Sequence, residues 1–194
     1  LALSHSRSGF YGEVKAKMGQ SAVEVFRELF CAMPLAYVLN NQVMVVHGGI
    51  PTCEEGGDLD SLRKIDRVRE PPDSGPMCEC LWNDPQEMPG TTPNKRGVGF
   101  AFGPDVTKKY LDANGLKLLV RSHEVKEEGY ELTHDGYCCT IFSAPNYCDQ
   151  MGNKGAFIRF NGADMVPHFT QFDASPHPDV PPMKYASNMF SQGF

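Results

Sequence analysis

The chain has 194 residues and a formal net charge of −6, from 18 Lys and Arg against 24 Asp and Glu. Its hydrophobic share of 41% and charged share of 22% are typical of a globular protein and argue against intrinsic disorder. The basic residues are scattered and form no basic cluster, so we expect no nucleic-acid partner. No apolar run, those around 43–46 and 116–120 included, approaches the roughly 20 residues of a membrane-spanning helix, so we expect no membrane partner.

The seven cysteines predict free thiols in a reducing compartment, because their number is odd and residues 1–8 lack the apolar core of a secretory signal. No pair has Cys-x-x-Cys spacing, so no structural zinc site is predicted. Cys138 and Cys139 lie in an expected strand, which would turn them to opposite faces of a sheet. We expect a cytoplasmic location, with the nucleus as a second one.

The first part of the chain is expected to form a helix and a hairpin. Apolar residues at helical spacing predict an amphipathic helix over 21–35, which a proline closes. Strands are expected over 36–39 and 42–46, joined at Asn40-Asn41, a dipeptide that tolerates left-handed turn geometry. The second strand is apolar on both faces, which predicts a central place in a sheet.

The middle of the chain is expected to form two helices and a second central strand. Residues 59–69 read as a charged helix before a proline-rich loop at 71–76; basic residues at 63–69 are interleaved with Asp66 and Glu70, as on a solvated helix face. A helix over 104–114 opens on a proline and ends at an Asn–Gly stop. The strand expected over 116–120 is apolar except for Lys117.

The last part of the chain predicts two antiparallel hairpins and a short tail helix. The strand pairs are 130–133 with 137–142, turning at Asp135-Gly136, and 156–160 with 165–172, turning at Asn161-Gly162. The tail helix is expected over 183–190. This order of elements predicts a mixed α/β layered sheet rather than a regular series of βαβ units.

Two histidines lie at or near the ends of the two apolar strands. His47 opens the sequence His47-Gly48-Gly49, and His123 closes Arg121-Ser122-His123. Catalytic and ligand-binding groups collect at the ends of central strands, and a histidine beside glycines suits a metal ligand or an acid–base group. Each histidine alone also fits a hydrogen-bonded packing residue, so both interpretations stay open.

Two further side chains suit phosphate binding. Arg96 precedes a glycine-rich stretch, and a guanidinium offers a planar fork that matches phosphate oxygens. Tyr147 lies in a polar turn after an apolar strand and could donate a hydrogen bond at a cleft. Taken singly, Arg96 fits a surface ion pair equally well, and Tyr147 fits an ordinary loop residue.

Five short segments occur in a fixed order along the chain. They are His47-Gly48-Gly49, Leu81-Trp82-Asn83-Asp84-Pro85, Arg96-Gly97-Val98, Arg121-Ser122-His123-Glu124 and Ser143-Ala144-Pro145-Asn146-Tyr147-Cys148. Together they resemble the C-terminal half of the metal-dependent serine/threonine phosphoprotein phosphatases. The resemblance covers 9–194 and implies an α/β metallo-dependent (calcineurin-like) phosphatase fold, a mixed β-sheet sandwich flanked by helices. Residues 1–8 look unlike the family and are unassigned.

The resemblance implies hydrolysis of phosphoserine and phosphothreonine in proteins with two divalent metal ions and no phosphoenzyme intermediate. His47 and His123 would each ligate a metal, and the family favours manganese or an iron–zinc pair. Arg96 and Tyr147 would bind the phosphate oxygens as catalytic and substrate-binding residues. No such role is assigned to Arg121.

Segments 12–17, 71–78 and 149–154 resemble one subtype of the family, whose catalytic domain follows tetratricopeptide repeats. No such repeat occurs here. The implied partners are phosphoprotein substrates and a regulatory tetratricopeptide domain in the full-length protein.

Three family motifs that carry other metal ligands and an acid histidine, GDxHG, GDxVDRG and GNHE, do not occur in this sequence. His5 lacks the frame of the last motif and receives no role.

The chain begins with Leu, as expected of a start inside a longer protein, and two histidines without a carboxylate cannot hold a two-metal site. We therefore expect this chain alone to be inactive. The alternatives are a non-catalytic truncated isoform or pseudo-phosphatase that acts as a binding module, and a generic domain that binds one metal ion.

The apolar strands at 43–46 and 116–120 also require cover on both faces. We expect part of that cover to come from outside this chain, and hence low solubility.

Overall fold

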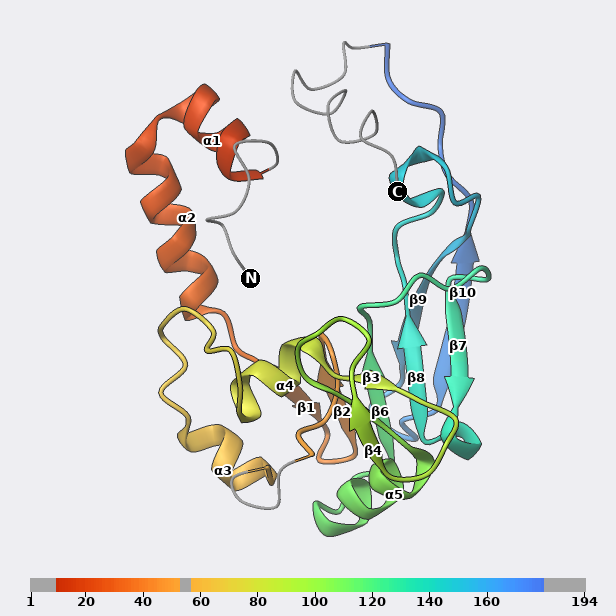
Figure 1. Cartoon of the computed structure of the whole chain (residues 1–194). Coiled ribbons are helices and arrows are strands. Elements are labelled where there is room, and N and C mark those ends of the chain that lie inside the picture. Colours follow the sequence, from red (N-terminus) through yellow and green to blue (C-terminus); the bar gives the residue numbers. More distant parts are fainter. Residues whose placement is uncertain (1–9, 53–56, 180–194) are drawn as a thin grey trace. The chain divides into compact units, whose positions relative to one another are not determined.

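The computed structural model describes residues 10–52 and 57–179, which belong to two compact units (Figure 1). One unit contains the helices α1 (Phe10–Met18) and α2 (Gln20–Ala32) with the segment Asp66–Pro71. The other contains Pro34–Ile65 and Pro72–Ser175, and all strands of the described residues lie in it. No helix within the described ranges has the length and apolar character needed to cross a membrane.

The helical unit is held by aromatic packing and by one arginine. The ring of Phe10 lies 5.1 Å from that of Phe26 and 5.6 Å from that of Phe30. Arg67 donates to the carbonyls of Ala32 and Met33, which are left without helical partners where α2 ends. The predicted helix over 21–35 is thus confirmed but ends three residues early, before the proline. Helix α1 was not predicted.

The second unit is built on a five-stranded mixed sheet in the order β1-β2-β6-β8-β7. Its strands are β1 (Ala36–Leu39), β2 (Val43–Val46), β6 (Leu118–Arg121), β7 (Tyr130–Thr133) and β8 (Cys138–Ile141). Strands β2, β6 and β8 are parallel, and β1 and β7 pair antiparallel at the two edges. Both expected apolar strands are therefore central, and their carboxyl ends meet at one edge of the sheet.

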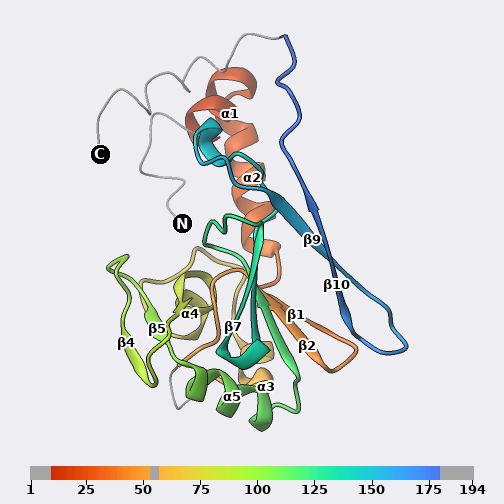
Figure 2. The ribbon, with the colours of Figure 1, turned by 90° about the vertical axis from the view of Figure 1, so that its right-hand side faces the viewer.

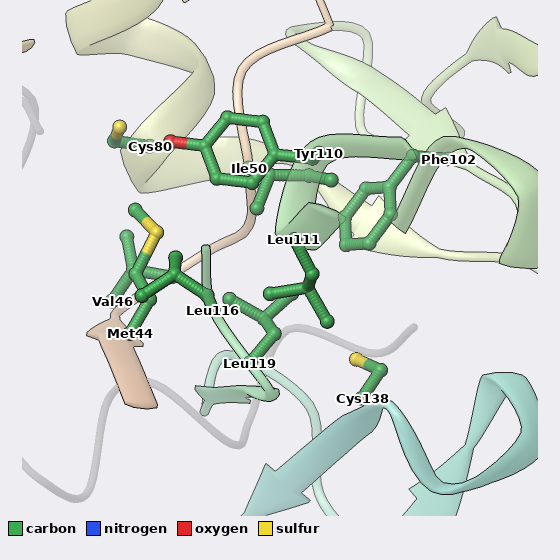
Figure 3. Close-up of a cluster of buried hydrophobic side chains, with 10 residues drawn as sticks. All are labelled: Met44, Val46, Ile50, Cys80, Phe102, Tyr110, Leu111, Leu116, Leu119 and Cys138. Atoms are coloured by element: carbon green, nitrogen blue, oxygen red, sulfur yellow. The ribbon is translucent and has the colours of Figure 1, made fainter. Parts of the chain in front are cut away.

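One face of this sheet packs against helices. Helix α4 (Pro76–Trp82) contributes Cys80, and α5 (Pro104–Ala113) contributes Tyr110 and Leu111 to a cluster with Met44 and Leu119 of the sheet. Figure 3 shows the side chains of this cluster, with the hydroxyl of Tyr110 directed toward Cys80. The expected helix over 104–114 is confirmed.

The opposite face packs against the hairpin of β9 (Gly155–Phe160) and β10 (Pro167–Phe172), the long pair of strands in Figure 2. The hairpin brings Ile158, Phe160 and Phe169 onto Val43 and Val120. The expectation that these central strands need cover from outside the chain is therefore wrong, because its own hairpin and helices bury them on both faces. Cys138 and Cys139 belong to opposite clusters, which confirms their predicted orientation.

A small three-stranded sheet in the order β3-β5-β4 was not predicted. Its strands are β3 (Asp84–Pro85), β4 (Thr91–Pro93) and β5 (Phe100–Phe102). They are too short for a periodic signal. Helix α4 was missed as well, because its seven residues follow a run of prolines and glycine.

Helix α3 (Leu59–Lys64) begins as predicted, where the Asp58 side chain accepts hydrogen bonds from the Asp60 and Ser61 amides. It ends at Lys64 rather than at residue 69, because the residues after Ile65 join the helical unit, where Glu70 pairs with Arg27. The tail helix expected over 183–190, the segment 1–8 with His5, and Cys53 lie outside the described residues.

Candidate functional site

His47 and His123 meet at the carboxyl edge of the main sheet. Their strands β2 and β6 are parallel neighbours, with Val45 opposite Val120. One step further along, the Ser122 amide donates to the His47 carbonyl at 3.0 Å. The two imidazole rings lie 4.8 Å apart between centroids. The sheet thus brings together the two histidines that the sequence singled out.

The glycines after His47 allow the chain to pass against the end of α4. The Gly48 amide donates to the Cys80 carbonyl at 2.9 Å, and a Cβ at Gly48 would lie 2.5 Å from the carbonyl carbon of Leu81. A Cβ at Gly49 would lie 2.4 Å from the ring of Phe102. No residue with a side chain fits here without moving backbone or core, so the glycines fix the path of the chain beside His47.

A single hydrogen bond sets the orientation of His123. Its Nδ1 lies 2.9 Å from the Leu81 carbonyl oxygen, which only accepts, so Nδ1 carries the proton. Its Nε2 is therefore left with a lone pair, as in metal-binding histidines that donate their other nitrogen to a carbonyl. The backbone of His123 is left-handed, with φ 68°, and the ring of Trp82 lies 5.6 Å from the imidazole.

Both imidazoles are held in the neutral form. Burial lowers the pKa of His47, and the charges of Arg121 and Arg96 lower it further. Burial, followed by the charge of Arg96, lowers the pKa of His123 to about 4. Neutral imidazole is the form that binds metal ions, so these surroundings prepare both side chains to be ligands at neutral pH.

We expect the imidazole of His123 to titrate at pH about 4 in NMR spectra of the metal-free 194-residue chain. The same ring in urea should titrate near 6.5, the ordinary value. Because the unfolded state then binds more protons between these pH values, the free energy of unfolding should fall as the pH is lowered through this window. A folded-state titration of His123 near 6.5 would contradict the assigned environment.

Asp84 joins the two arginines of the site. Its Oδ2 accepts from Nε of Arg96 at 2.6 Å and its Oδ1 from Nη2 of Arg121 at 2.6 Å. Burial by itself would raise the pKa of Asp84, but hydrogen bonds from Arg96 and Asn94 and the charge of Arg121 outweigh it and lower the pKa below its usual value. The carboxylate is therefore ionised and orients both guanidinium groups.

Arg96 reaches from Asp84 to the histidines. Its Nη2 donates to the His123 carbonyl at 3.1 Å, and its side chain keeps 30% of its surface exposed. Arg121 has no exposed side-chain surface. Of the two guanidinium groups, that of Arg96 can therefore meet a phosphate that enters from solvent.

Tyr147 is not joined to these residues by the contacts of the described residues. Its amide donates to Oδ1 of Asn153 at 2.8 Å, and its ring meets the ring of Phe142 edge-on at 5.1 Å. The turn places Asn146 and Cys148 in left-handed geometry and leaves Tyr147 43% exposed. Its role in phosphate binding stays a prediction.

His47 and His123 fit a metal ion by donor type, protonation and closeness. Within residues 10–52 and 57–179, however, no three or more His, Cys, Asp or Glu side chains gather to hold a metal. The described residues thus offer two nitrogen ligands, and a dinuclear centre needs others besides them.

Asp84 and Asn83 were not recognised as functional from the sequence. Asn83 is fully buried; its Nδ2 donates to the Ile50 carbonyl at 2.8 Å and its Oδ1 accepts from the Phe100 amide at 2.7 Å. It thereby ties the loop after His47 to β5. The available signal was an Asn-Asp pair between apolar residues, in a chain with two arginines, Arg96 and Arg121, in the segments that suggested the site.

The fold and this site define a calcineurin-like phosphoesterase. The model of that family matches residues 5–127, and the chain belongs to it. The chain is 60% identical over 186 residues to serine/threonine-protein phosphatase 5 of Solanum lycopersicum, covering 94% of this chain and 33% of the relative. It is 55% identical over 185 residues to the human protein of the same name, covering 95% of this chain and 37% of the relative.

A solved structure has the same fold. It is a protein serine/threonine phosphatase from Saccharomyces cerevisiae described as similar to human phosphatase PP5, with a TM-score of 0.83 and 39% identity, covering 91% of this chain and 58% of that chain. These comparisons confirm the predicted family, fold and subtype resemblance. The chain spans about a third of the length of the curated relatives it matches.

Proposed function

We propose that this chain is the C-terminal part of a protein serine/threonine phosphatase that hydrolyses phosphoserine and phosphothreonine in proteins. The observation that carries the proposal is the meeting of two neutral imidazoles, His47 and His123, with the partly exposed guanidinium of Arg96 at one edge of the sheet. The names of the relatives agree with it.

His47 and His123 would each hold a divalent metal ion through a ring nitrogen. Neutral imidazole suits borderline ions, so we propose manganese or an iron–zinc pair as the metals. When bound, the metal ions supply Lewis-acid stabilisation of phosphate oxygens. Arg96 would bind further phosphate oxygens; Asp84 holds its Nε and the His123 carbonyl holds its Nη2, which fixes the guanidinium beside the histidines. Its fixed positive charge stabilises negative charge that grows in the transition state.

A second function is a non-catalytic binding module. The absence of a third potential metal ligand beside His47 and His123, within the part of the chain that the structure describes, favours it for the 194-residue chain by itself.

We expect the 194-residue chain to show no turnover of a phosphoserine peptide with manganese, and the full gene product to show turnover. The two proteins are assayed side by side at equal concentration. Turnover by the 194-residue chain would contradict the expected inactivity, and an inactive full product would contradict the phosphatase proposal.

Sequencing of the transcript upstream of Leu1 separates the alternatives, because GDxHG and GNHE motifs there favour the enzyme and their absence favours the binding module. Calorimetry with manganese tests a single-metal domain, for which this chain would bind tightly by itself.

We also propose phosphoprotein substrates, and a regulatory tetratricopeptide domain in the full-length protein. About two thirds of the length of the relatives lies outside the match, which leaves room for such a domain. Cys31, Cys78, Cys138, Cys139 and Cys148 are free thiols, which supports the proposed cytoplasmic, and also nuclear, location.

A further inference from the structure

Arg121 is a fully buried charged side chain in the middle of the site. A guanidinium without partners in such surroundings would cost several kcal/mol, so the fold must provide acceptors for its donors. Since none of its surface reaches solvent, Arg121 cannot bind a phosphate that enters from outside. The role of Arg121 therefore follows from the residues that its hydrogen bonds connect.

Two of these bonds reach the residues that directly follow the histidines. Nε donates to the carbonyl of Gly48, next to His47, at 2.6 Å. Nη1 donates to the carboxylate of Glu124, next to His123, at 2.8 Å. One rigid, planar group thus holds both histidine-bearing turns, which come from different strands.

The third nitrogen connects the histidines to the phosphate-binding arginine. Nη2 donates to Asp84 at 2.6 Å and to the Asn83 carbonyl at 3.4 Å. Asp84 in turn accepts from Arg96, whose Nη2 donates to the His123 carbonyl. The contacts close a ring that runs from Arg121 through Asp84 and Arg96 back to the turn of His123.

We infer that Arg121 is a positioning residue, which fixes His47, His123 and Arg96 relative to one another and does not touch the substrate. The inference rests on the proposed function, because it concerns metal ligands and a phosphate ligand. A lysine at this position keeps the positive charge but has one nitrogen, which cannot reach Gly48, Asp84 and Glu124 with the fixed geometry of a guanidinium.

The test is manganese binding by the full gene product, with wild type, Arg121→Lys and the control Arg27→Lys, which alters an exposed ion pair. Loss of groups that orient metal ligands weakens metal affinity about 10–100-fold, and we expect this rise in the manganese Kd for Arg121→Lys. Excess manganese should restore part of its turnover. A purely structural role would reduce the folded fraction and leave the Kd of the folded protein unchanged.

A wild-type Kd in folded Arg121→Lys would overturn the inference. If that variant does not fold, Glu124→Ala removes one partly exposed arm of the same network, and a wild-type Kd in this variant would overturn the inference instead. If the wild-type protein neither binds manganese nor hydrolyses a phosphoserine peptide, the proposed function itself fails. The failures of the two proposals are therefore distinguishable.

Discussion

Replacement of Asp84 by alanine is expected to destabilise the 194-residue chain by about 3–5 kcal/mol, the usual effect of removing one partner of a buried ion pair. Asp84 is 4% exposed and is the carboxylate shared by Arg96 and the fully buried Arg121. Without it, the charge of Arg121 is opposed only by Glu124, on one side of the guanidinium. The loss should appear as a lower urea midpoint.

Trp82 is the chain's one tryptophan and lies two residues before Asp84, so its fluorescence reports unfolding at the site itself. The matched control is Asp112→Ala, which removes an exposed carboxylate paired with Lys108 on α5. Exposed pairs contribute little, so the control should stay within about 1 kcal/mol of wild type. Equal stability of the two variants would show that the ion pairs of Asp84 with Arg96 and Arg121 do not stabilise the fold.

Replacement of Arg96 by alanine in the full gene product is expected to lower kcat/KM for a phosphoserine peptide by about 10²–10³, the usual loss for one donor to transition-state charge. The effect should lie mainly in kcat, since the charge on the phosphate oxygens grows in the transition state. The kcat/KM of Arg96→Lys should lie between those of wild type and Arg96→Ala, because lysine keeps the positive charge but lacks the planar fork of a guanidinium.

Arg63→Ala is the control for Arg96, because Arg63 forms an exposed ion pair with Asp60 on α3, away from the histidines in the sequence. It should leave kcat/KM unchanged. If Arg96→Ala matched Arg63→Ala within twofold, the assignment of phosphate binding to Arg96 would have to be withdrawn.

The sequence predicted best those elements whose own residues form a recognisable pattern. Residues 43–46 are apolar throughout and 116–120 are apolar except for Lys117, which predicts central strands. His47 directly follows the first segment, and His123 lies three residues after the second. That these histidines meet depends on parallel pairing of β2 with β6, strands separated by more than seventy residues, which no local pattern encodes. The resemblance of five short segments, rather than periodicity, indicated that they belong to one site.

Other parts of the site depend on tertiary contacts alone. Asp84 looks like any acidic residue until Arg96 and Arg121 are placed on either side of it. Arg121 itself received no role, because burial separates a positioning arginine from a phosphate-binding one, and burial at a strand end is not visible in the sequence. Helix α3 likewise stopped short of its predicted end, because the residues that follow pair within the other unit.

The central claim is that His123, with His47, binds metal, and manganese binding by a His123→Asn form of the full gene product tests it most directly. Asparagine tolerates the left-handed backbone at this position, so the variant removes the imidazole with little strain. The control is His168→Asn, at an exposed position of β10. We predict that His123→Asn binds manganese more than about 100-fold more weakly than wild type, since a ligand is lost outright, whereas His168→Asn binds like wild type. Wild-type manganese binding by His123→Asn would contradict the account.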